Sequence, residues 1–249
     1  MKLICSVVLF AVMSIVSVSE VRSEEMKDVY SCGIAQGYPP YQFQNDAGEP
    51  VGLDVDVLKL VFEKMNKKVI FRQDKWNNIV ANLCYGDLDC VGGMEVNQTR
   101  RSCFDFTTPY YSRRITVFVL ADNNDIQNIQ DLKWQTIAGD RHSFVEQLFK
   151  KQGLMKQIRI FQTKSKDESM RLLKEGTVAA VIAPRAVGSY LAKKYEINVR
   201  MLEYSDQGSP VALAVKKGND ALLQQLESAL MELEQDGKLN VIFKKWGIQ

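Results

Sequence analysis

The chain has 249 residues, of which 25% are charged, and its 32 basic side chains nearly balance the 30 acidic ones to give a net charge of +2. Proteins that bind nucleic acid carry a basic stripe or a recognisable binding motif. This sequence has neither, so no nucleic-acid partner is expected. The length allows one large domain or two lobes of roughly 100 residues each.

The amino terminus is typical of a secretory signal peptide. Lys2 supplies a positive start, an apolar run covers residues 3–18, and small and polar residues follow. The run is short for a membrane-spanning helix of about 20 residues, and no basic stop-transfer cluster comes after it. We therefore expect residues 1–23 to be cleaved, near Ser19 or Ser23, and favour export over a membrane anchor.

Four cysteines remain behind the signal segment: Cys32, Cys84, Cys90 and Cys103. An even number of cysteines in an exported protein favours disulfides. We expect all four to pair, which leaves three connectivities open. Zinc is the competing interpretation, but the chain has no CxxC spacing and His142 is its only histidine. No metal and no cofactor are expected.

Short apolar strands alternate with amphipathic helices in the first half of the chain, which is typical of an α/β protein with mostly parallel sheets. The predicted strands are 29–35, 69–71 and 88–93. Asp54 is expected to cap a helix, whose apolar positions recur at helical spacing through Met65. A second helix with the same spacing begins at Trp76.

The second half repeats this alternation, with strands predicted at 115–120, 136–138, 178–183 and 211–215. Ser143 and Glu146 form a capping box that opens a helix. Ser165 and Glu168 form a second capping box before another helix. A long helix is predicted over 222–233, near the end of the chain. Two strand–helix series of similar size predict two lobes, and ligands of such folds lie at the carboxyl ends of the strands.

Four segments resemble the amino-acid-binding family of periplasmic solute receptors, which serves importers of histidine, arginine, lysine, glutamine and cystine. They are GYPPYQF (37–43), GLDVDVLKLVFEKM (52–65), GGMEVNQTRRSCFDFTTPYY (92–111) and NDALLQQLESALMELEQDGKLNVIFKKWG (219–247). The segments follow the order of the family and cover nearly all of the chain behind the signal segment, so the resemblance is specific.

The resemblance implies a monomer with the two-lobed periplasmic binding protein fold (type II), two mostly parallel sheets joined by a two-segment hinge. Residues 24–113 and 206–249 would form lobe 1, and residues 114–205 would form lobe 2. The hinge segments are expected near 112–115 and 204–208. Ligand binding would close the lobes by a hinge motion.

The function that the resemblance implies is that of a periplasmic receptor of an ABC importer. It would bind an amino acid or a related small carboxylate and deliver it to a membrane permease. An enzyme is the main alternative, because cyclohexadienyl dehydratases share the fold; Glu95 or His142 would then donate a proton to prephenate or arogenate. A sensory receptor subunit is a third possibility. We expect a binding protein and not an enzyme.

Arg100 is the first ligand-binding candidate that the resemblance gives. The family places an arginine six positions before the phenylalanine of its FTxPY run, as Arg100 precedes Phe106. A guanidinium binds a carboxylate through two parallel hydrogen bonds, which lysine cannot copy. Arg101 is assigned to the surface. Tyr38 and Trp76 resemble the aromatic walls of the family, although core packing is an alternative for Trp76.

Gly92, Gly93 and Met94 match the segment of the family whose backbone faces the ligand. Glycine there allows a close approach of the backbone, and a plain turn is the alternative. The interval that precedes Gly93 is one residue shorter than usual, which can displace the backbone donors. Glu95 stands where relatives carry a small polar residue or aspartate; it would bind a cationic group or pair with Arg100.

The second lobe departs from the pattern of the family. Relatives commonly carry an aspartate that accepts the α-ammonium of the ligand, and this chain has Pro184 and Arg185 there. Arg141 precedes the helix that Ser143 opens, and helix N-termini beside basic residues favour anions. Either Arg141 and Arg185 face the cleft and the ligand has acidic character, or both point to solvent and Glu95 takes the ammonium.

Overall fold

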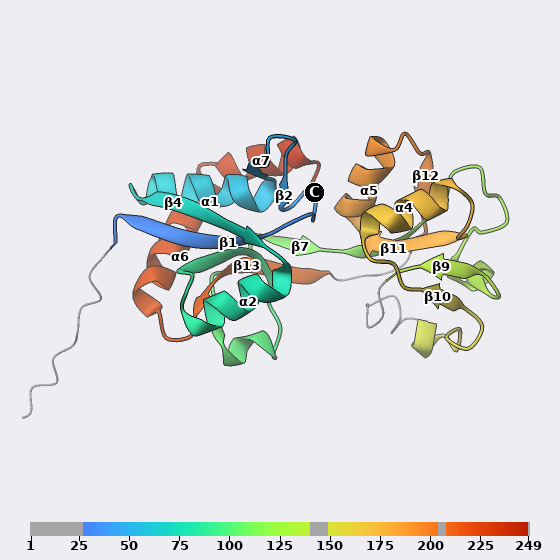
Figure 1. Cartoon of the computed structure of the whole chain (residues 1–249), viewed down its shortest axis with the longest axis horizontal. Coiled ribbons are helices and arrows are strands. Elements are labelled where there is room, and N and C mark those ends of the chain that lie inside the picture. Colours follow the sequence, from blue (N-terminus) through green and yellow to red (C-terminus); the bar gives the residue numbers. More distant parts are fainter. Residues whose placement is uncertain (1–26, 140–148, 204–207, 249) are drawn as a thin grey trace, which may run out of the picture.

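The computed structural model describes residues 27–139, 149–203 and 208–248. Two α/β lobes lie side by side and are joined by an extended crossing (Figure 1). The predicted signal segment 1–23, and the helix start with Arg141 and Ser143, lie outside the described residues. Within the described ranges, no helix is long and apolar enough to span a membrane.

The first lobe contains a sheet of order β4-β1-β5-β13-β6, in which β7 also pairs with β13. Its strands are β1 (Val29–Ala35), β4 (Lys68–Asp74), β5 (Cys90–Glu95), β6 (Phe104–Phe106), β7 (Tyr111–Arg113) and β13 (Ser209–Lys216). The strands β2 (Phe43–Gln44) and β3 (Pro50–Val51) form a separate short ladder. The helices of this lobe are α1 (Leu53–Lys64), α2 (Trp76–Tyr85), the 3-10 turn η1 (Arg100–Ser102), α6 (Asp220–Gln235) and α7 (Lys238–Trp246).

The second lobe contains a sheet of order β10-β9-β11-β8-β12. Its elements are β8 (Ile115–Leu120), the 3-10 turn η2 (Ile129–Leu132), β9 (Thr136–Ala138), β10 (Arg159–Phe161), α4 (Lys166–Lys174), β11 (Ala180–Pro184), α5 (Arg185–Lys194) and β12 (Val199–Met201). Ser165 caps α4, because its hydroxyl accepts the N–H of Glu168 at 3.1 Å. This cap confirms the helix start that the sequence predicts.

Each sheet combines parallel and antiparallel strands. Pairing is parallel within β4-β1-β5 and within β10-β9-β11. By contrast, β13 runs antiparallel to β5, β6 and β7, and β8 runs antiparallel to β11 and β12. The sequence predicts mostly parallel sheets and does not single out these antiparallel strands. Two of them, β7 and β8, carry the chain across between the lobes, with Arg114 alone between them. The boundaries at 113/114 and 205/206 stay a prediction.

The first turn of α1 differs from the expected capping. Gly52 is the N-cap residue, with φ 129°, and a Cβ there would lie 2.2 Å from the carbonyl oxygen of Tyr41. Asp54, predicted as the cap, lies inside the helix and is fully buried. Its carboxylate therefore needs partners from elsewhere in the lobe, since a buried charge without them is costly.

One disulfide is present among the described cysteines, between Cys32 and Cys90. These residues face each other in the β1–β5 ladder, with Cα atoms 4.6 Å apart. Cys84, in the last turn of α2, and Cys103, which follows η1, are free thiols. Hydrogen bonding to Cys103 is the main cause that raises the pKa of the Cys84 thiol. The expectation of two disulfides is therefore corrected to one, because the structure bonds Cys32 to Cys90 and leaves Cys84 and Cys103 as free thiols.

We expect reduction of the Cys32–Cys90 disulfide to destabilise the first lobe. The two cysteines are 58 residues apart in the sequence. A disulfide that closes a loop of this size contributes roughly 2–4 kcal/mol to the free energy of unfolding. Urea unfolding of Cys32→Ala should show this loss relative to the unreduced wild type. Cys84→Ala serves as the matched control and should retain most of the stability. Equal losses in the two variants would contradict a stabilising role of the disulfide.

Candidate functional site

The predicted first-lobe residues gather at one edge of the first sheet. Tyr38 lies in the loop after β1, Trp76 opens α2 directly after β4, and Glu95 ends β5. Because β1, β4 and β5 run parallel, their carboxyl ends meet at the same edge. Arg100 opens η1, the turn that follows β5. The structure brings these four residues to one end of the sheet, and their contact with a ligand stays a prediction.

Arg100 is held between Trp76 and the end of β5. Its Nη1 donates to the carbonyl oxygen of Glu95 at 2.7 Å, and its Cζ lies 5.4 Å from the ring centroid of Trp76. Partial burial lowers the pKa of Arg100; the charge of Glu95 opposes this shift and that of Arg113 adds to it. Among the described residues, Nε and Nη2 have no hydrogen-bond partner, so two donors remain on one edge of the guanidinium.

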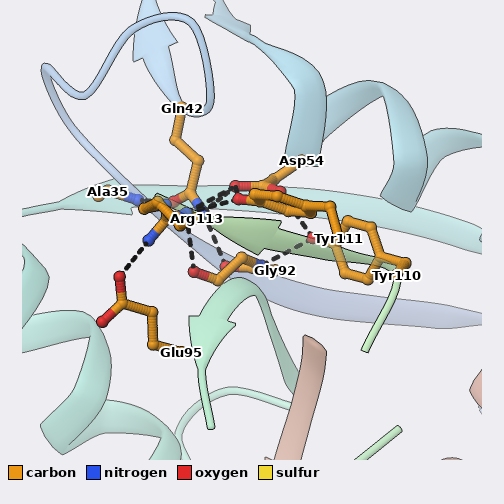
Figure 2. Close-up of polar contacts among 9 residues, drawn as sticks. Ala35, Gln42, Asp54, Gly92, Glu95, Tyr110, Tyr111 and Arg113 are labelled. Carbon is orange, nitrogen blue, oxygen red and sulfur yellow. Dashed lines mark hydrogen bonds and ion pairs between the residues drawn. The ribbon is translucent and has the colours of Figure 1, made fainter. Parts of the chain in front are cut away.

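Behind this edge lies a buried polar network around Asp54 (Figure 2). Its carboxylate accepts Gln42 Nε2 at 2.8 Å and Tyr110 Oη at 2.6 Å. Tyr110 Oη in turn accepts the N–H of Gly93 at 3.1 Å. Burial raises the pKa of Asp54, although the charge of Arg113 and these hydrogen bonds oppose the shift. The network fixes the loop of Gln42, the first turn of α1 and the end of β5 relative to one another.

Arg113, the last residue of β7, turns back into the first lobe and lies between Glu95 and Asp54 (Figure 2). Its Nη1 is 3.3 Å from Glu95 Oε1, its Nη2 donates to Tyr111 Oη at 2.5 Å, and its Nη2 is 3.9 Å from Asp54 Oδ2. Burial opposes the charged form, but the surrounding tyrosine and carboxylate oxygens outweigh it and raise the pKa of Arg113. The residue is therefore a buried cation.

Gly92 and Gly93 supply backbone groups to this network, and Met94 follows them in β5. The carbonyl oxygen of Gly92 accepts Gln42 Nε2 at 2.8 Å. Gly93 has φ 67°, and a Cβ there would lie 2.0 Å from Asp54 Oδ2, so only glycine fits. The side chain of Met94 is fully buried in the core. Contact between the backbone of these three residues and a ligand stays a prediction.

Arg185 lies in the second lobe as the exposed first residue of α5. Its N–H donates to the carbonyl oxygen of Arg114 at 2.8 Å, and its Nε lies 3.3 Å from Met201 Sδ. It lines a cavity of about 380 Å³ together with Tyr41, Ser112 and Arg114. None of its described hydrogen bonds reaches Arg100 or Glu95. The other two second-lobe candidates, Arg141 and Ser143, lie outside the described residues.

Arg113, Gln42 and Asp54 are not among the site residues that the sequence predicts. A signal for Arg113 was present, since Tyr111 and Arg113 are two residues apart on an extended segment and so share one face. That spacing places the guanidinium on the side of the ring of Tyr111. The direction of this face, toward the first lobe, follows only from the pairing of β7 with β13.

Two α/β lobes joined by crossing strands, with an arginine and aromatic side chains at the strand ends of one lobe, define a two-lobed ligand-binding protein. The family model of bacterial extracellular solute-binding proteins, family 3, matches residues 30–249. The chain belongs to this family.

Individual relatives agree with this assignment. The chain is 26% identical over 226 residues to the L-cystine-binding protein TcyA of Bacillus subtilis, covering 90% of this chain and 83% of that protein. It is 30% identical over 216 residues to a probable amino-acid ABC transporter-binding protein of Haemophilus influenzae, with coverages of 84% and 80%. A solved ancestral arginine-binding protein bound to arginine has a TM-score of 0.75 and 30% identity, over 89% of this chain and 99% of that chain. These relatives are named as binding proteins, which favours a receptor over the dehydratase alternative.

Proposed function

We propose that this chain is the extracytoplasmic receptor of an ABC importer and captures an amino acid or a related small carboxylate. Arg100 is the observation that carries the proposal. It is half-buried at the edge where three parallel strands end, it is held by Glu95 and Trp76, and it keeps two donors on one edge. Such an edge suits a carboxylate in two parallel hydrogen bonds. Relatives that are named as amino-acid-binding proteins support the same ligand class.

The remaining candidates take complementary roles in this proposal. The faces of Tyr38 and Trp76 hold the apolar part of the ligand, and the half-exposed carboxylate of Glu95 receives its ammonium group. Closure of the hinge brings the second lobe, with Arg141, Ser143 and Arg185, onto the ligand. The closed form then docks on the membrane permease.

The proposal also includes the cellular setting and the chain organisation. Residues 1–23 direct export to the periplasm and are removed, and the mature protein is a monomer. Lobe 1 comprises 24–113 and 206–249, and lobe 2 comprises 114–205. Mass spectrometry of the exported protein and light scattering of the purified protein test these statements separately from ligand binding.

A thermal-shift screen tests the function directly. The mature protein is melted with each of the twenty amino acids, cystine, dicarboxylates and keto acids. At 100 times its Kd, a ligand stabilises the folded state by about 2.7 kcal/mol, so at least one amino acid or related carboxylate should raise Tm. No stabilisation by any of these compounds would refute the ligand class. Conversion of prephenate to phenylpyruvate would instead establish the dehydratase.

A further inference from the structure

Three tyrosine rings enclose the guanidinium of Arg113. Its Cζ lies 4.4 Å from the ring centroid of Tyr41, 5.1 Å from that of Tyr38 and 5.5 Å from that of Tyr111. Tyr41 stacks on the other two rings, with centroid distances of 5.7 Å to Tyr38 and 5.4 Å to Tyr111. The side chain of Arg113 is only 7% exposed. We call this enclosure of Tyr38, Tyr41 and Tyr111 the tyrosine cage.

The tyrosine cage has the chemistry of a site for a cation. Aromatic faces attract a guanidinium, and this attraction increases when water is excluded. Two carboxylates, Glu95 at 3.3 Å and Asp54 at 3.9 Å, add charge complementarity. The guanidinium of a free ligand would find the same rings and the same acids there. In this protein the chain itself supplies the cation.

Arg113 is poorly explained as a purely structural ion pair. Within the described part of the chain, its Nε is buried without a hydrogen-bond partner. A buried donor without a partner lowers the stability of the protein. Replacing a buried charged side chain by an apolar one of similar size often leaves the stability unchanged. The charge of Arg113 therefore needs another explanation. The location of Arg113 next to the proposed ligand site provides one.

The tyrosine cage shares residues with the proposed ligand site. Tyr38 is both a wall of the cage and a predicted wall of the ligand site. Glu95 contacts Arg113 through its carboxylate and Arg100 through its carbonyl oxygen. A ligand whose carboxylate bound Arg100 would lie close to Arg113, because Glu95 contacts both arginines. A cationic side chain there would meet an occupied cage and a like charge.

We propose that Arg113 determines specificity by filling the tyrosine cage, so that the receptor rejects ligands with cationic side chains and accepts neutral or acidic ones. This inference rests on the proposed function for the class of ligand, but the occupancy of the cage can be tested without any amino acid.

The first experiment compares ligand preference by calorimetry in the mature wild type, Arg113→Ala and Arg101→Ala. Arg101 is exposed on η1, so its variant removes one positive charge from the same lobe. The wild type should bind arginine at least about tenfold more weakly than its best neutral or acidic ligand. Arg113→Ala should bind arginine about tenfold or more tightly than the wild type does, because the vacated cage admits a guanidinium. Arg101→Ala should keep the preference of the wild type.

The second experiment measures Tm with methylguanidinium chloride at millimolar concentrations, against sodium chloride at equal ionic strength. Methylguanidinium should raise the Tm of Arg113→Ala and leave the wild type and Arg101→Ala unchanged. This readout reports the cage alone. If the cage binds methylguanidinium while the wild type binds no amino acid or related carboxylate, the proposed function has failed and this specificity role fails with it.

Two results would overturn the inference. One is a wild type that binds arginine as tightly as any neutral or acidic ligand. The other is an Arg113→Ala protein with the ligand preference of the wild type and no response to methylguanidinium. If Arg113→Ala does not fold, Arg113→Gln keeps a hydrogen-bonding side chain in the lobe, removes the cation and undergoes the same comparisons.

Discussion

Arg100→Ala is expected to abolish detectable ligand binding while the protein remains folded. The substitution removes the guanidinium edge proposed to bind the ligand carboxylate. Truncating one partner of a desolvated charge pair costs roughly 2–5 kcal/mol, or about 30-fold to several thousand-fold in affinity. Calorimetry with the best ligand from the thermal-shift screen measures this loss. The unliganded protein should melt near the wild-type temperature, since Arg100 is half-buried and contributes little to the core.

Two further variants make the test specific. Arg101→Ala removes a neighbouring exposed charge and should retain wild-type affinity. Arg100→Lys keeps the charge but loses the planar fork, so it should bind more weakly than the wild type. Wild-type affinity in Arg100→Ala would mean that the ligand carboxylate binds elsewhere.

Much of the fold follows from periodicity in the sequence. The predicted strands 29–35, 115–120 and 136–138 match β1, β8 and β9. The apolar spacing in α1 is confirmed, because Leu58, Val61 and Phe62 are buried. The short edge strands β10 and β12 were not predicted, since three residues at the edge of a sheet are too few to show an alternating pattern.

Some residues of the candidate site can also be predicted from the sequence, and others cannot. Tyr38, Trp76 and Glu95 each directly follow or end a strand, so parallel pairing of the strands is enough to bring them to one edge. Arg113 depends on a different property, the direction in which a hinge residue turns its side chain. Sequence spacing relates it to Tyr111 but cannot say which lobe receives both side chains. The pairing of β7 with β13 settles this direction.

Asp54 shows why a local motif can mislead. An aspartate before an apolar helical pattern is a good predictor of an N-cap. Gly52 takes that position, because the chain there passes so close to Tyr41 that no side chain fits. Asp54 is thereby shifted into the first turn, where its carboxylate reaches Gln42 and Tyr110. These long-range partners cannot be read from the spacing of the helix.

Asp54→Ala is expected to lower the free energy of unfolding by about 3–5 kcal/mol, because removing one partner leaves the buried cation of Arg113 without its nearby buried acid. It also leaves the amide of Gln42 and the hydroxyl of Tyr110 short of an acceptor. Urea unfolding measures the loss. Glu63→Ala removes an exposed acid from the same helix and should stay within about 0.5 kcal/mol of the wild type.

A double-mutant cycle separates the charge pair from the rest of the network. Arg113→Met replaces the guanidinium by an apolar side chain that fills much of the same space among the tyrosine rings. If the charge of Arg113 is what makes the loss of Asp54 so costly, Asp54→Ala should cost less in the Arg113→Met background than in the wild type. The remaining cost then measures the unpaired groups of Gln42 and Tyr110. Strictly additive losses would show that Asp54 stabilises the lobe through its hydrogen bonds alone, with no contribution from the charge 3.9 Å away.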